Sequence, residues 1–130
     1  MSGTRTVYLD SSAIVKLISK EKESEALFEF LADYPGRVAS RLARTETVRT
    51  LRRLDYEQSA VAKRTEEVFA NIRLVEISNE IADLAAVIGP PTLRALDALH
   101  VATAQTLGDE LSGIVTYDGR MAAAAKEIGL

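Results

Sequence analysis

The 130-residue chain has 47% hydrophobic and 27% charged residues, which is typical of one globular domain and too short for two full cores. It has no cysteine and one histidine, His100, which excludes disulfides, thiol nucleophiles, thiolate zinc sites and multi-histidine metal sites. Asp10 interrupts the N-terminal segment, and no apolar run approaches the ~20 residues that span a bilayer. We therefore expect a single cytoplasmic domain over residues 1–130, neither secreted nor membrane-spanning.

The net charge is −3 at pH 7, but the charge is unevenly distributed along the chain. Residues 37–53 contain six arginines and one acid, Glu46, so this segment carries +5 and the remainder carries −8. An arginine-rich segment can attract phosphate groups, or it can form an ordinary solvated helix face. The charge distribution alone leaves both interpretations open.

In the first half of the chain, short apolar strands alternate with helices. Thr6–Leu9 is a β-rich run, and Asp10-Ser11-Ser12 supplies capping residues for a helix that follows it. A further apolar repeat at helical spacing ends at Pro35-Gly36, before a brief strand at 38–40. Helices are then expected at 41–54 and 57–71.

The second half repeats this alternation. A strand is expected at 74–77, followed by a helix that Ser78 caps and that runs to Gly89. After Pro90-Pro91, the pattern predicts a helix at 92–107, a strand at 113–117 and a final helix from Asp118-Gly119 to Gly129. Strands connected by helices imply a mainly parallel sheet covered by helices, so we predict an α/β fold of the three-layer sandwich type.

Two acids fall at the ends of predicted strands, Asp10 after the first and Asp118 after the last. Ligands of parallel sheets bind beyond the carboxyl ends of the strands, which makes both acids candidates for a site. Viewed singly, however, each acid is better explained as a helix cap or a turn residue. Their chemical role depends on what lies beside them.

Two further acids lie within predicted helices. Asp97 occurs in LRALDALHVATA, which is so rich in apolar residues that a carboxylate there is costly unless it pairs with Arg94 or binds a cation. Glu46 lies at the edge of the apolar face of its helix, where an ordinary glutamate would be solvated or paired with an arginine.

These four acids could converge on one edge of the sheet. Four neighbouring carboxylates repel one another and persist only if they are protonated or neutralised by cations. Oxygen ligands without thiolates, and with scarcely any imidazole, favour Mg²⁺ or Mn²⁺ over structural zinc. The pattern therefore indicates a site for a hard divalent ion.

The sequence also resembles a known family along almost its whole length. The resemblance is carried by VYLDSSAIVKL, by Glu46 in the helix after Ser40, by LRALDALHVATA and by VTYDGRMAAAAKEIG. These motifs, in this order and at this spacing, resemble those of PIN-domain ribonucleases, and most closely those of the VapC toxins of bacterial toxin-antitoxin pairs. The resemblance implies a PIN-like fold.

The resemblance also implies roles for individual residues. The catalytic acids would be Asp10, Glu46, Asp97 and Asp118, of which Asp10, Asp97 and Asp118 would bind the metal and Glu46 would act through a water or as the base. Polar residues that assist these acids would be Ser12 and Thr116. The phosphates of the RNA would be contacted by arginines among Arg41, Arg44, Arg49 and Arg53. The lone His100 is interpreted as a hydrogen-bonded core residue and not as a general acid.

By the same resemblance, the expected activity is that of an endoribonuclease dependent on Mg²⁺ or Mn²⁺. It would use a metal-activated water to cleave RNA and would leave a 3′ hydroxyl and a 5′ phosphate. The expected partners are the RNA substrate, a cognate VapB-like antitoxin and a second copy of the chain in a homodimer.

Two other classes of protein are considered. A phosphotransfer enzyme of the haloacid-dehalogenase type also has an aspartate after its first strand, but it needs a second acid where this chain has Ser12. A non-catalytic α/β interaction module, in which the acids merely cap helices, is the main alternative. Binding of Mn²⁺ distinguishes this module from the nuclease, because dispersed acids would not bind the ion together.

Overall fold

The computed structural model describes residues 5–54 and 58–130. Within these ranges the strands are β1 (Thr6–Leu9), β2 (Gly36–Ser40), β3 (Arg73–Val75) and β4 (Gly113–Val115). The helices there are α1 (Ser11–Ile18), α2 (Ser24–Leu31), α3 (Arg41–Arg53), α4 (Gln58–Phe69), α5 (Asn79–Val87), α6 (Ala95–Leu107) and α7 (Gly119–Glu127), with a 3₁₀ turn at Gly108–Glu110. No helix among them is both long and apolar enough to cross a membrane.

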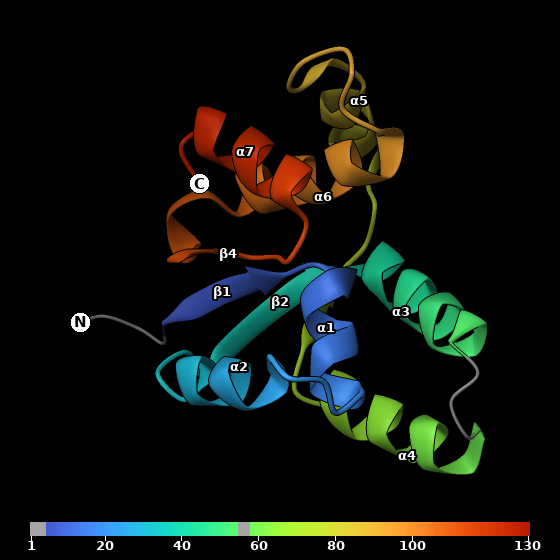
Figure 1. Ribbon diagram of the computed structural model, residues 1–130. Coiled ribbons are helices and arrows are strands. Elements are labelled where there is room, and N and C mark those ends of the chain that lie inside the picture. Colours follow the sequence, from blue (N-terminus) through green and yellow to red (C-terminus); the bar gives the residue numbers. More distant parts are fainter. Residues whose placement is uncertain (1–4, 55–57) are drawn as a thin grey trace.

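The four strands form one parallel sheet in the order β3-β2-β1-β4. Val7 of β1 pairs with Arg37 on one side and with Gly113 on the other. The chain proceeds outward from β1 through β2 to β3 and then returns to the opposite side of β1 to form β4 (Figure 1). The strand order therefore reverses between β1 and β4, which is where ligands of open α/β sheets bind.

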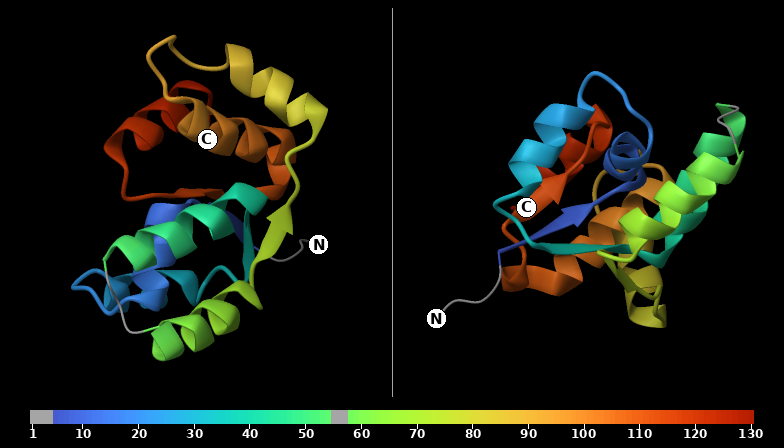
Figure 2. Two further views of the ribbon diagram at one scale, coloured as in Figure 1. Left: turned by 90° about the vertical axis from the view of Figure 1, so that its right-hand side faces the viewer. Right: turned by 90° about the horizontal axis from the view of Figure 1, so that it is seen from below.

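Alternation along the strands divides the core into two layers. Val7 and Leu9 pack on one face of the sheet, in the large cluster that includes apolar residues of α1, α2 and α3. Tyr8 and Val38 point to the other face and pack with Ala104 of α6. Figures 1 and 2 show the resulting sandwich, with α5, α6 and α7 over one face of the sheet and α1, α2 and α4 over the other. The predicted α/β three-layer fold is confirmed.

Most predicted elements are present, and the largest differences fall at the site edge of the sheet. β4 ends at Val115, two residues earlier than predicted, because side-chain oxygens replace the next strand hydrogen bonds. The N–H of Tyr117 donates to Ser12 Oγ (2.8 Å), and that of Asp118 donates to Thr116 Oγ1 (3.0 Å). The chain thus leaves the sheet just before the acid.

Helix α6 begins at Ala95, three residues later than predicted. Leu93 N–H donates to the carbonyl of Pro90 (2.9 Å) in a turn, and Arg94 has an extended backbone. Asp97 consequently lies in the first turn of α6 and not in its middle. Among the other differences, α2 ends at Leu31, and the predicted start of the fourth helix at residue 57 lies outside the described residues.

Candidate active site

Asp10 lies at the end of the central strand and is the most enclosed of the four acids, with 2% of its surface exposed. Its Oδ1 accepts hydrogen bonds from Ser12 Oγ (2.7 Å) and from the N–H of Ala13 (3.1 Å), so the side chain caps α1. Its Oδ2 accepts a hydrogen bond from Thr116 Oγ1 at 2.5 Å. Three donors therefore fix both oxygens of this carboxylate.

The segment after β4 holds the second strand-end acid in a similar way. Asp118 caps α7, because its Oδ1 accepts from the N–H groups of Arg120 (2.9 Å) and Met121 (3.4 Å). Thr116 connects the two acids, since its hydroxyl bonds to Asp10 and also accepts from the Asp118 N–H. Asp10 and Asp118 thus lie beside the point at which the strand order reverses.

A buried hydrogen-bond chain places Glu46. Tyr8 (0% exposed) and His100 (1% exposed) meet through Tyr8 OH and His100 Nδ1 at 2.7 Å, and His100 Nε2 meets Glu46 Oε1 at 2.5 Å. Tyr8 OH also accepts the N–H of Ser40, the N-cap of α3 (3.2 Å). Burial raises the pKa of Tyr8, so its hydroxyl keeps its proton. A carboxylate only accepts hydrogen bonds, so Nε2–H of His100 donates to Glu46.

Asp97 differs from the other three acids because nothing in the described residues donates to it or pairs with it. Partial burial raises the pKa of Asp97, and the negative charges of Asp118 and Glu46 act in the same direction. His100 and, to a smaller extent, Arg94 oppose this rise in pKa, but neither forms an ion pair or hydrogen bond with the carboxylate of Asp97. Asp97 is thus a partly buried carboxylate with no hydrogen-bond or ion-pair partner among the described residues.

The four acids lie on one rim and influence one another electrostatically. The negative charges of Asp118 and Glu46 raise the pKa of Asp97, and those of Asp10 and Glu46 raise the pKa of Tyr8. Within the part of the chain that the structure describes, no three of these side chains come close enough to form a ready set of ligands for one ion. The donors are nevertheless all oxygens and carry excess negative charge, so their chemistry fits Mg²⁺ or Mn²⁺.

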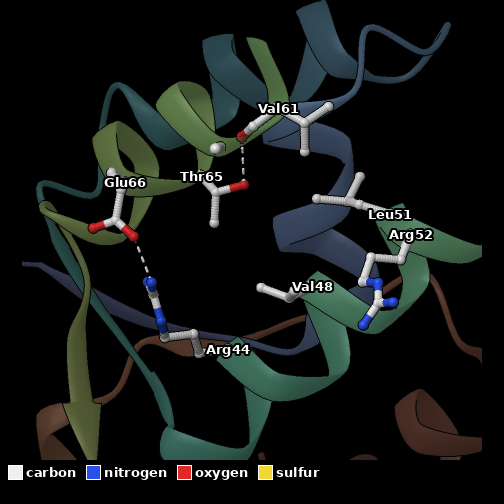
Figure 3. Close-up of a pocket in the computed structure, with 8 residues that line it drawn as sticks. Arg44, Val48, Leu51, Arg52, Val61, Thr65 and Glu66 are labelled. Carbon is white, nitrogen blue, oxygen red and sulfur yellow. Dashed lines mark hydrogen bonds and ion pairs between the residues drawn. The ribbon is translucent and has the colours of Figure 1, made fainter. Parts of the chain in front are cut away.

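The arginine-rich helix α3 divides its arginines between two surroundings. Arg44 forms an ion pair with Glu66 of α4 and lies over the ring of Phe69, so its guanidinium is already engaged. Figure 3 shows this ion pair at the wall of a cavity of about 220 Å³ between α3 and α4, which also includes Val48 and Leu51. The predicted role of Arg44 in RNA binding stays a prediction, and it would require the guanidinium to exchange Glu66 for a phosphate.

The other predicted arginines remain available. Arg49 and Arg53, together with Arg52, line a surface pocket of about 360 Å³. Arg41 is exposed at the start of α3. None of these four makes a hydrogen bond or ion pair through its side chain within the described residues.

The sequence interpretation missed the roles of Tyr8 and His100. His100 is the buried, hydrogen-bonded residue that we expected, but its partner is one of the four acids. A signal for this existed, since Tyr8 lies two residues before Asp10 on a strand and His100 lies three residues after Asp97 on a helix. Both carry polar groups into an apolar layer, where such groups need partners.

Comparison with known proteins identifies the family of the chain. The PIN-domain family model matches residues 7–127, and the chain therefore belongs to the PIN-domain family. Solved structures share the fold: Mycobacterium tuberculosis VapC20, described as a sarcin-ricin loop cleaving toxin, has a TM-score of 0.73 and 18% identity over 91% of this chain and 94% of that chain. A toxin-antitoxin complex from Klebsiella pneumoniae has a TM-score of 0.64 and 23% identity over 84% of each chain.

Relatives with higher identity place the chain within one branch of that family. It is 47% identical to ribonuclease VapC46 of M. tuberculosis, over 95% of this chain and 93% of the relative. It is 39% identical to ribonuclease VapC35 of the same species, again over 95% of this chain and 93% of the relative. The chain is a member of the VapC family of PIN-domain proteins.

The buried chain of hydrogen bonds can be tested through stability. Tyr8→Phe removes the hydroxyl and leaves His100 Nδ1 and the Ser40 N–H without this partner in the interior. We expect the free energy of unfolding to fall by about 1–3 kcal/mol in urea denaturation. The control is Tyr34→Phe, which loses only the exposed hydrogen bond from Arg5 and should change little. Equal losses in the two variants would contradict the structural role of Tyr8.

The environment of Asp97 predicts how stability changes with pH. The folded protein raises the pKa of Asp97, so proton binding by Asp97 contributes to the free energy of unfolding. This contribution is fully present below the pKa of about 3.9 in the unfolded chain, and it is lost as the pH rises through the pKa in the folded protein. In metal-free buffer at pH 7, Asp97→Asn should therefore unfold at a higher temperature than the native protein, and this gap should close below about pH 4. Calorimetric scans at both pH values check this. The exposed Asp33→Asn variant should show no such gap, and a gap that persists at low pH would refute the assignment.

Proposed function

We propose that this protein is an endoribonuclease toxin that hydrolyses RNA phosphodiester bonds with water and depends on Mg²⁺ or Mn²⁺. One observation carries the proposal: Asp97 is a partly buried carboxylate with no hydrogen-bond or ion-pair partner among the described residues, under the electrostatic influence of Asp118 and Glu46, in a chain that is 47% identical to ribonuclease VapC46. The proposal covers the reaction, the metal and the roles of the residues.

The metal would be held by Asp10, Asp97 and Asp118. When bound, the ion supplies the positive charge that activates the attacking water and polarises the phosphate. The carboxylate of Asp97 supports this assignment, since an ion would supply the direct partner that the described residues do not. The cleaved RNA would carry a 3′ hydroxyl and a 5′ phosphate.

The remaining residues would orient the acids and handle the proton. Ser12 and Thr116 hold the carboxylate of Asp10, which leaves its orientation little freedom. His100 holds Oε1 of Glu46 and leaves Oε2 available to accept a proton from the attacking water. No side chain needs to attack the phosphorus, so the absence of cysteine from the chain is consistent with this chemistry.

The main alternative is a non-catalytic interaction module whose acids cap helices. Asp10 and Asp118 do cap α1 and α7, as that alternative requires. Capping does not account for Asp97, whose carboxylate has no hydrogen-bond partner among the described residues, or for Glu46, which is held by a buried histidine. The two helical acids therefore favour the enzyme.

For the partners, we propose an RNA substrate, a cognate VapB-like antitoxin and a homodimer in the cytoplasm. The solved toxin-antitoxin complex with the same fold supports the antitoxin. The cavity between α3 and α4, with the exposed Val48 beside it, offers an apolar surface for a protein partner. The homodimer and the extent of the single domain over residues 1–130 stay predictions.

Substitution of a single acid tests the metal assignment. Asp97→Asn keeps the shape of the side chain but removes its charge, so we expect it to abolish RNA cleavage and to weaken Mn²⁺ binding while the protein stays folded. Calorimetric titration with Mn²⁺ and an RNA cleavage assay measure the two effects. Asp109→Asn, in the exposed 3₁₀ turn, is the matched control. Undiminished Mn²⁺ affinity in Asp97→Asn would refute the shared metal site.

The arginines that remain available on α3 can be tested through their salt dependence. Combined Arg49→Gln and Arg53→Gln substitutions should reduce cleavage several-fold at low salt and much less at high salt, because salt screens the attraction to phosphate. Rates measured across a salt series check this. A double variant of the exposed Lys22 and Lys63 removes equal charge elsewhere and should have a smaller effect. Equal losses at every salt concentration would contradict electrostatic guidance.

A further inference from the structure

A second cavity has Asp97 in its wall, and the proposed mechanism uses that acid but none of the other residues of the wall. It lies between the segment before α6 and one face of α7, encloses about 450 Å³, and includes Asp97 in its wall. Figures 1 and 2 show α6 and α7 packed together on one face of the sheet. A volume of this size is within the range of small-ligand sites in proteins.

The charges in the wall of this cavity are unequally placed. Arg94 lies just before α6 and Arg120 lies in the first turn of α7, so both are near the end of the cavity that holds Asp97. Neither guanidinium forms a hydrogen bond or ion pair within residues 5–54 and 58–130. This differs from Arg37, Arg44 and Arg64, which all donate to protein oxygens. Free guanidinium groups of this kind suit a phosphate.

The rest of the wall suits a flat, partly apolar group. Arg120, Ala123, Ala124 and Glu127 recur at the spacing of a single helix face, so two alanines separate the arginine from the glutamate. Ala124 is buried and packs with Leu93 at the base of the cavity, whereas Ala123 and Pro90 are exposed in its wall. Seven residues of helix place the Glu127 backbone about 10 Å beyond that of Arg120. This spacing is comparable with the reach of a nucleotide from its phosphate to the far edge of its base.

We propose that this cavity binds one nucleotide of the RNA substrate, next to the phosphate that is cleaved. Arg94 and Arg120 hold its phosphate, the exposed Ala123 and Pro90 pack against its base, and Glu127 accepts hydrogen bonds from the edge of the base. A carboxylate only accepts hydrogen bonds, so the cavity selects a base with N–H donors at that edge. Guanine fits best because it has two neighbouring donors there. This inference rests on the proposed function, since it concerns the substrate of the same site.

Binding of mononucleotides tests the cavity without cleavage. In EDTA, NMR titrations of the full chain with 5′-GMP, 5′-AMP and 5′-UMP should give the tightest binding for GMP, about tenfold tighter than for AMP. AMP is the key comparison because it has a base of similar size without the two neighbouring donors. Arg120→Gln should weaken the binding of all three nucleotides about tenfold. Glu127→Gln should instead remove the preference for GMP over AMP.

The control is Lys126→Gln, which removes a charge from the same helix outside the cavity and should alter neither property. If Arg120→Gln does not fold, Arg120→Lys serves instead. Lysine keeps the positive charge but cannot donate two parallel hydrogen bonds to a phosphate, so phosphate binding should still weaken. Equal binding of GMP and AMP, or a preference unchanged in Glu127→Gln, would overturn the inference. Cleavage of RNA by the native protein then shows which proposal has failed. Active protein without nucleotide preference refutes the cavity alone, whereas selective binding without any cleavage supports the cavity and refutes the ribonuclease.

Discussion

The arrangement of the site depends on a buried chain of hydrogen bonds that runs from Ser40 through Tyr8 and His100 to Glu46. The chain begins and ends on the same helix, because Ser40 caps α3 and Glu46 lies two turns into it. Between these points it passes through β1 and α6. The three elements that carry Asp10, Glu46 and Asp97 are therefore held in one register by a chain whose inner members, Tyr8 and His100, are shielded from water and whose end, Glu46, is partly exposed.

A network of this kind constrains the elements because Ser40, Tyr8 and His100 are buried and their polar groups need partners. A shift of α6 along the sheet would separate His100 from Tyr8 and from Glu46 together. An apolar layer alone would tolerate such a shift more readily, since hydrophobic contact is not directional. Tyr8 and His100 thus position the acids without taking part in the proposed reaction themselves.

Much of the fold could be predicted from the sequence because it depends on local patterns. Alternating strands and helices, the Pro35-Gly36 break and the capping residue Asp10 all lie within short segments. The early end of β4 and the late start of α6 could not be predicted from such local patterns. β4 ends where Ser12, about a hundred residues away in sequence, takes over a backbone N–H, and local propensity contains no information about such a contact.

The candidate site likewise has features that the sequence predicts and features that depend on tertiary packing. The types and order of the four acids are visible in the sequence, and so is the suitability of oxygen ligands for a divalent ion. The engagement of Arg44 by Glu66 and the bond of His100 to Glu46 depend on how helices pack, with partners 22 and 54 residues apart. Sequence patterns therefore predict the candidate residues of the site better than they predict the hydrogen bonds and ion pairs that these residues form.

The place of β4 in the chain has a consequence for synthesis on the ribosome. β1 lies at the centre of the sheet, but its neighbour β4 is translated about a hundred residues later, together with Thr116 and Asp118. Until that segment emerges, Asp10 lacks the Thr116 hydrogen bond and the sheet lacks the strand beside it. A nascent chain therefore cannot assemble this group of acids, and completion of the site is coupled to the emergence of its fourth strand.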